Sequence, residues 1–160
     1  MTMRFALQPC DEQFLDTARA RYVDTMEIPV PADQVWADLV SDETLGWCRV
    51  VSRVKWTSPR PFGVGTTRTL RLRGGLLSVD ERYFRWEEGR RKSFCVVGAS
   101  LPLFRRFAED YLVEEVSPTS SRLTWTIAAE PSMAGRPGAP VNALLTRSLF
   151  RDTRRHFGAT

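Results

Sequence analysis

The sequence predicts an α+β fold: a curved antiparallel sheet of seven strands wrapped around one long C-terminal helix, with two short helices after the first strand. Three observations predict it. Strand-like segments separated by turns of hairpin length fill residues 50–131. Apolar residues recur with a helical period in residues 32–40 and again after Pro140. Because an antiparallel sheet buries one face and only the C-terminal helix is long enough to cover it, we expect the sheet to curve around that helix.

A leader is predicted to precede this domain. Residues 1–20 lack the later pattern, and residues 21–160 are predicted to form a single domain. Within the leader, residues 10–20 are predicted to form a short helix, because Asp11 can accept a hydrogen bond from a free N–H at its start.

The first strand is predicted at residues 21–30, where β-forming side chains are frequent. Pro31 stands where the first residue of a helix tolerates proline, and the helix that follows carries its apolar residues on one side. These are Ala32, Val35, Trp36, Leu39 and Val40. Ser41 or Asp42 is predicted to cap a second short helix that ends near Gly46.

Six further strands are predicted between residues 50 and 131, each bounded by residues typical of turns. They are the segments 50–57, 65–74, 76–88, 91–100, 105–116 and 121–131. The long helix is predicted from Pro140 to about Phe157, with Gly158 as its stop. Its predicted buried stripe is Val141, Leu144, Leu145, Ser148 and Leu149.

The composition is that of an ordinary globular protein. Among 160 residues, 42% are apolar, and 23 basic and 19 acidic residues give a net charge of +4. This mild excess does not require nucleic acid as a partner, and none is expected. No apolar run approaches the roughly 18 residues of a membrane span. The first residues lack a small-residue cleavage site, so no signal peptide is expected and a cytoplasmic location is predicted.

Histidine and cysteine are too sparse for several kinds of site. His156 is the only histidine, so neither a histidine-based catalytic triad nor a histidine-rich metal site is expected. Cys10, Cys48 and Cys95 lack metal-ligand spacing and indicate reduced thiols. We therefore expect no metal and no organic cofactor. No catalytic residue can be named, and any catalysis would use Glu, Asp, Tyr, Arg or an ordered water.

The glycines of "FGVGTTRTL" resemble a phosphate-binding loop, but such a loop must lead into a helix N-terminus. Here it leads into the alternating pattern of a strand, so the glycines are predicted to form a turn. Alternation places Arg71 and Arg73 on one face, predicted to meet solvent. Arg68 shares the opposite face with Leu70 and Leu72, and would be a cation beside a cavity if that face is concave.

The next strand offers a possible partner for this arginine. Val79, Glu81 and Tyr83 share one face, whereas Phe84 and Trp86 share the other. If the first set faces inward, Glu81 becomes a buried carboxylate that can pair with an arginine; if it faces outward, Glu81 is a solvated carboxylate. The candidate ligand-binding residues are Arg68, Leu70, Glu81, Tyr83, Phe94, Tyr111, Trp125, Leu145 and Leu149.

Several stretches resemble the polyketide cyclase/dehydrase and lipid-transport group of the START-like (Bet v 1-like, SRPBCC) superfamily. They are "MEIPVPADQVWADLVSDETLGWC", "FGVGTTRTLRL", "VDERYFRWEEGRRKSF" and "SSRLTWTIAAEP", and the likeness covers about residues 20–157. The resemblance implies a helix-grip fold with a hydrophobic cavity between sheet and long helix. Members of this superfamily bind lipids, sterols, polyketides or plant hormones, some are aromatase/cyclases, and others associate with chaperones or ribosomes.

Three functions follow from these predictions. The first is binding or carriage of a small hydrophobic molecule, such as a lipid, a polyketide or an aromatic compound, by a monomer or homodimer. The second is an enzyme of the cyclase, aromatase or dehydratase type that uses Arg68 with Glu81 or Tyr83 inside the cavity. The third is a ribosome- or chaperone-associated interaction domain. It would use the basic end of the last helix, which carries Arg147, Arg151, Arg154 and Arg155.

Overall fold

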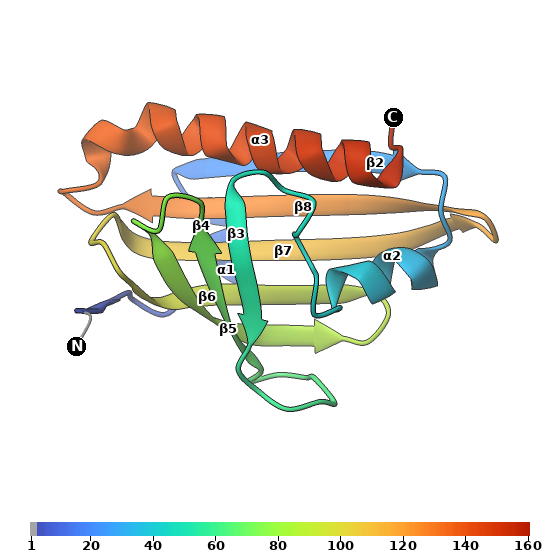
Figure 1. Ribbon diagram of the computed structural model, residues 1–160, viewed down its shortest axis with the longest axis horizontal. Coiled ribbons are helices and arrows are strands. Elements are labelled where there is room, and N and C mark those ends of the chain that lie inside the picture. The colour runs from blue at the N-terminus through green and yellow to red at the C-terminus, as the bar shows by residue number, and fades with distance from the viewer. Residues whose placement is uncertain (1–2) are drawn as a thin grey trace.

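A curved antiparallel sheet grips one long helix in the computed structural model, which describes residues 3–160 (Figure 1). Seven strands lie in the order β2-β8-β7-β6-β5-β4-β3, and every neighbouring pair is antiparallel. They are β2 (Ala20–Ile28), β3 (Val51–Trp56), β4 (Thr67–Leu72), β5 (Ser78–Glu87), β6 (Arg91–Ala99), β7 (Phe104–Ser117) and β8 (Ser120–Pro131). The predicted fold class is confirmed.

The leader is part of the folded structure, apart from its first two positions, which lie outside the described residues. A short strand, β1 (Phe5–Ala6), pairs with the end of β6. The helix α1 (Glu12–Thr17) follows, and the Asp11 side chain accepts a hydrogen bond from the Phe14 N–H, as the sequence predicts. Phe14 and Leu15 are buried against β7 and β8, on the outer face of the sheet.

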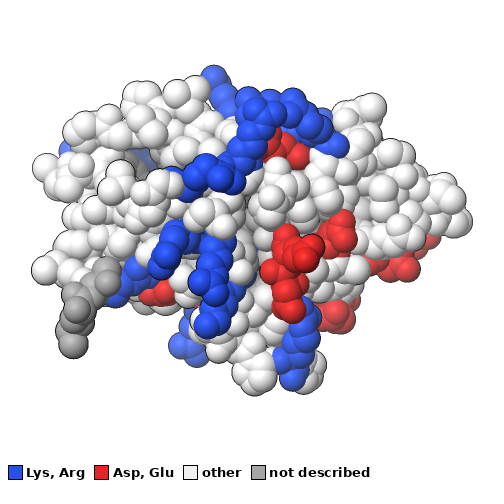
Figure 2. Space-filling view, viewed as in Figure 1, with Lys and Arg blue, Asp and Glu red and all other residues white. Residues whose placement is uncertain are grey.

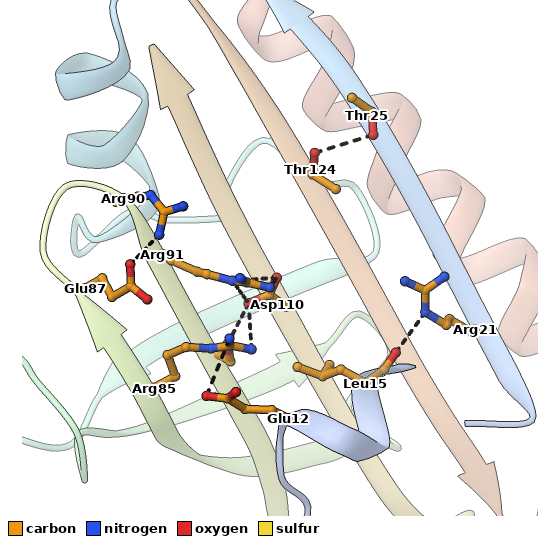
Figure 3. Close-up of polar contacts among 11 residues, drawn as sticks. Glu12, Leu15, Arg21, Thr25, Arg85, Glu87, Arg90, Arg91, Asp110 and Thr124 are labelled. Carbon is orange, nitrogen blue, oxygen red and sulfur yellow. Dashed lines mark hydrogen bonds and ion pairs between the residues drawn. The ribbon is translucent and has the colours of Figure 1, made fainter. Parts of the chain in front are cut away.

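Ion pairs add to this attachment on the outer face (Figure 3). Glu12 of α1 lies 3.5 Å from Arg85 of β5, and Arg85 lies 3.7 Å from Asp110 of β7. Asp110 also accepts two hydrogen bonds from Nε and Nη2 of Arg91 in β6, at 3.1 and 3.0 Å. The leader is therefore held on the outer face by ion pairs as well as by apolar contacts, and the concave face carries the main apolar core.

One predicted helix is replaced by turns. The helix α2 (Ala32–Leu39) forms as expected and buries Val35, Trp36 and Leu39. The segment 41–50, predicted to begin with a second short helix, instead forms successive turns closed by hydrogen bonds from residue i+3 to residue i. Leu45 has a φ of 61°, a left-handed conformation that a continuing α-helix does not accept.

The helix α3 (Ala139–Phe157) follows a short 3₁₀ turn, η1 (Arg136–Gly138), and ends at Gly158 with a φ of 64°. Leu145 and Leu149 turn toward the sheet, as predicted, but Val141 and Leu144 are 58% and 63% exposed. The predicted stripe is wrong at these two positions, because the first turns of α3 lie over the cavity rather than over a packed core.

The concave face includes one residue that alternation places outside. Val79, Glu81 and Tyr83 face inward, but a register shift between Tyr83 and Arg85 breaks the alternation of β5. Trp86 therefore contacts Tyr83 on the inner side, with ring centroids 5.0 Å apart, while Phe84 packs outside. Among the described residues, no helix is long and apolar enough to cross a membrane.

Candidate functional site

A cavity of about 340 Å³ lies between the N-terminal half of α3 and the concave face of the sheet. All seven strands from β2 to β8 and the helix α3 contribute to its walls, so residues distant in sequence meet there. Most of the lining side chains are aliphatic or aromatic. They include Tyr22, Leu70, Leu72, Val79, Val96, Phe107, Trp125, Ile127, Leu145 and Leu149. Only a few charged groups interrupt this apolar surface.

Arg68 and Glu81 form a buried ion pair on the cavity wall. They lie directly opposite each other on β4 and β5, and the Arg68 Nε donates to Glu81 Oε2 at 2.5 Å. The side chains are only 1% and 3% exposed. Burial raises the pKa of the Glu81 carboxyl, while the Arg68 charge opposes that rise. Of the two orientations left open by the sequence, the inward one is found.

The two terminal nitrogens of Arg68 lack hydrogen-bond partners. Both Nη1 and Nη2 are buried, and neither contacts an acceptor among the described residues. Aromatic rings surround the guanidinium instead, with its central carbon 5.1 Å from the Trp56 centroid and 5.2 Å from the Phe94 centroid. Ring faces stabilise the positive charge, but they do not replace the missing acceptors.

Glu109 places a second carboxyl group on the cavity wall. Its Oε2 accepts hydrogen bonds from the Tyr111 hydroxyl at 2.8 Å and from the Trp125 Nε1 at 2.9 Å. Burial, reinforced by the charge of Glu81, raises the pKa of Glu109 to about 7. At neutral pH this carboxyl is therefore able both to accept and to release a proton.

Lys92 is buried behind the cavity. Its Nζ donates to the Leu39 carbonyl oxygen at 2.7 Å and to the Tyr83 hydroxyl at 3.4 Å. Burial, followed by the charge of Arg68, lowers the pKa of Lys92 well below its ordinary value. Because Lys92 does not line the cavity, its role is to join α2 to the sheet rather than to face a ligand.

The structure places the predicted site residues in two groups. Six line the cavity: Arg68, Leu70, Glu81, Trp125, Leu145 and Leu149. The other three, Tyr83, Phe94 and Tyr111, are 1% exposed and pack behind the wall, around the charges of Arg68 and Lys92.

Sequence reasoning missed Glu109 and Lys92. A signal was present, because Glu109 alternates with the inward residues Tyr111 and Val113 of β7, and Lys92 alternates with Phe94 of β6.

His156 and the C-terminal arginines lie outside this cavity. His156 stacks on Trp47, with ring centroids 4.0 Å apart, and its Nε2 lies 3.0 Å from Asp38 Oδ2. Arg154 donates twice to Asp24, so it is not a free cation. In the part of the chain that the structure describes, no cluster of three His, Cys, Asp or Glu side chains could hold a metal ion.

Comparison with known proteins places the chain in a family. A family model described as polyketide cyclase/dehydrase and lipid transport matches residues 19–157. The chain belongs to this family. The resemblance seen in the sequence is thereby confirmed. Uncharacterised proteins from Mycobacterium tuberculosis and Mycobacterium bovis are each 34% identical over 161 aligned positions, which cover 96% of this chain and 95% of theirs.

Solved structures show the same fold at low sequence identity. A START superfamily protein from Mycobacterium smegmatis matches with a TM-score of 0.70 and 10% identity, over 86% of this chain and 97% of that one. The Zhui aromatase/cyclase from Streptomyces matches with a TM-score of 0.63 and 14% identity, over 85% and 94%. These likenesses identify the helix-grip fold. Family and fold together suggest binding of a hydrophobic ligand or polyketide cyclase-like activity.

Proposed function

We propose that this member of the polyketide cyclase/dehydrase and lipid-transport family binds a small, mostly apolar molecule that carries one carboxylate or carbonyl group. The apolar body of the molecule would occupy the cavity, and its oxygen would meet the free nitrogens of Arg68. The observation that carries the proposal is that Arg68, on the wall of a mostly apolar cavity, has no acceptor for Nη1 or Nη2 among the described residues.

The energetics of buried donors support this proposal. Each buried N–H without an acceptor costs about 1–3 kcal/mol, and a charged donor costs more. A carboxylate or carbonyl oxygen recovers this cost, and the fork of a guanidinium matches two oxygens of one group. The volume of about 340 Å³ is also within the range of small-molecule sites, roughly 300–1,000 Å³.

The experiment compares decanoic acid with decanol in binding titrations. Because loss of Arg68 alone strands Glu81 in the interior, both are changed together, Arg68→Met with Glu81→Gln. The control is Arg71→Met, which removes an exposed arginine from the outward face of the same strand. We expect the double variant to lose the preference for the acid by about tenfold or more, and the control to keep it. An unchanged preference in the double variant would refute the proposed role of Arg68.

A second candidate function, an enzyme of the polyketide cyclase type, is favoured by Glu109. Its pKa of about 7 suits a general base, and Oε1 remains available because Oε2 holds Tyr111 and Trp125. Glu109 would take a proton from the carbon next to a ketone carbonyl. Arg68 would stabilise the negative charge that then forms on the oxygen.

This second function is tested by following proton exchange into heavy water. NMR would measure deuterium uptake at the methyl group of 2-acetonaphthone, with and without protein. Glu109→Gln should abolish any acceleration, whereas Glu115→Gln, which changes an exposed carboxylate of the same strand, should retain it. No acceleration by the unaltered protein would count against this second function.

A further inference from the structure

Three loops meet at the open end of the cavity and form a continuous surface. The Ser100 hydroxyl donates to the Leu76 carbonyl oxygen and accepts from the Ser78 N–H, both at 2.9 Å. The Ser132 N–H donates to the Leu103 carbonyl oxygen at 3.0 Å. The mouth consists of these three loops, 73–77, 100–103 and 132–138, and the first turns of α3 (139–144).

Gly135 shows how closely two of these loops are packed. A Cβ atom at this position would lie 1.8 Å from the carbonyl oxygen of Leu103, so any side chain would separate the loops. The mouth therefore has a defined shape. It lies at the left end of the molecule in Figure 1, where α3 begins, opposite the hairpin that joins β7 and β8.

The mouth exposes large apolar side chains around the entrance to the cavity. Each of the three loops and α3 contributes at least one, and Val141 also lines the cavity. The exposed fractions are 78% for Leu76, 37% for Leu101, 76% for Met133, 58% for Val141 and 63% for Leu144. Exposed apolar groups gathered at one place indicate a contact surface rather than ordinary solvent exposure.

The charged side chains of the mouth are all positive. The segments 66–79, 92–108 and 131–151, which include the mouth, contain no aspartate or glutamate. They carry the exposed arginines Arg73, Arg105, Arg136 and Arg147. Two of the acidic residues that border these segments are paired with arginines, Asp80 with Arg4 and Glu130 with Arg105 and Arg106. Figure 2 shows this end as mostly uncharged with some basic side chains, and acidic side chains mainly in the other half of the view.

We propose that the mouth docks on the surface of an anionic lipid bilayer. The apolar side chains would enter the boundary between headgroups and acyl chains, and the arginines would contact lipid phosphates. The spacing in α3 supports this geometry, because Val141, Leu144 and Arg147 follow at intervals of three residues along one side of the helix. Docking would place the cavity entrance against the bilayer, where a ligand would enter and leave. This consequence rests on the proposed function. Docking itself requires no ligand.

The first test is flotation of the full chain with vesicles. One set contains phosphatidylcholine alone, and the other contains phosphatidylcholine mixed with phosphatidylglycerol. We expect binding to the mixed vesicles that weakens as salt is added. The double variant Met133→Asp with Leu144→Asp should lose it. Val116→Asp is the matched control, because Val116 is 51% exposed in the hairpin at the opposite end of the sheet.

A second pair of variants tests the charge separately. Arg147→Glu and Arg155→Glu make the same charge change at exposed positions on the same helix, but only Arg147 lies on the half of α3 that covers the cavity. We expect Arg147→Glu to weaken binding to the mixed vesicles by about tenfold or more, and Arg155→Glu to change it much less.

Several outcomes would overturn the inference. The unaltered protein could fail to bind the mixed vesicles, or the mouth variants could bind as well as their controls. Sedimentation could instead reveal a dimer that the mouth variants dissociate, which would assign the surface to a second copy of the chain. Decanoic acid binding, measured without vesicles, separates this proposal from the previous one. If the unaltered protein binds decanoic acid in preference to decanol but does not float with the mixed vesicles, docking alone is rejected. If it floats with them but shows no preference for the acid, the ligand site alone is rejected.

Discussion

The two ends of α3 differ in what lies beneath them. At the C-terminal end, Phe157 is 5% exposed, and its ring packs against Trp47 with centroids 5.6 Å apart. Beneath the N-terminal half the cavity of about 340 Å³ remains, lined by larger side chains such as Trp125 and by several small residues. Ala20 from β2, Ala129 from β8 and Ala139 from α3 are among them.

This difference arises from side-chain size rather than from the backbone elements. The same helix and the same sheet form both ends, but large aromatic rings cluster near α2. There Trp36 contacts Trp86, and Trp56 contacts Trp86 and Tyr83. An alanine cannot reach across the gap that a tryptophan fills. The packed end therefore supplies stability, and the hollow end supplies the space in which a ligand is proposed to bind.

The largest loss of stability is expected from a substitution at the packed end. Trp36 is 5% exposed, and its Nε1 donates to Glu88 Oε1 at 3.0 Å. Trp36→Ala should lower the free energy of unfolding by about 4 kcal/mol, because it leaves a large cavity in a closely packed region. Urea denaturation would measure the loss. A loss below about 1 kcal/mol would show that this end is not the stabilising one.

Breaking the ion pair between Arg68 and Glu81, at the boundary between the two ends, should cause the next largest loss of stability. Glu81→Leu leaves the Arg68 guanidinium buried without a counter-charge, at a cost of about 3 kcal/mol. This is the lower end of the usual range for removing one partner of a buried ion pair. Adding Arg68→Met should restore most of the lost stability in urea denaturation. Equal destabilisation in the single and double variants would contradict this account.

The raised pKa of Glu109 predicts that the stability of the protein depends on pH. The variant Glu109→Gln should lack this dependence. The pKa of Glu109 is about 7 in the folded protein and 4.5 in a reference carboxyl, so the folded state holds this proton more tightly. The stabilising contribution is complete below pH 4.5 and is lost as pH rises to about 7, amounting to about 3 kcal/mol at most. Glu109→Gln should remove that decline from urea denaturation measured across this range. Parallel stability profiles would refute the raised pKa.

The smallest loss of stability is expected when a leucine of α3 that lines the cavity is shortened to alanine. Leu145 is half-buried, so Leu145→Ala enlarges an existing space and should cost about 1 kcal/mol or less. The same substitution at Leu39, which is 1% exposed near α2, should cost about 2–5 kcal/mol. Equal losses in thermal or urea denaturation would show that packing does not differ between the two ends.

Strand periodicity was the most informative part of the sequence for the site. Alternation placed Arg68 with Leu70 and Leu72, and it offered Glu81 as a partner on the next strand; the register of β4 and β5 brings the two together. The same rule could have identified Glu109, because it shares a face with Tyr111. It failed at Trp86, since the irregularity after Tyr83 has no local marker in the sequence.

The amino-acid sequence by itself determined the order of the seven long strands, of α2 and of α3, together with the end of α3 at Gly158 and the cap of α1 at Asp11. These features depend on residues within a few positions of one another. Only the tertiary structure decided that a cavity remains, that Val141 and Leu144 are exposed, and that two nitrogens of Arg68 lack acceptors. Such features depend on the distance between a helix and a sheet. That distance is set by side chains from many separate segments, and no single stretch of sequence records it.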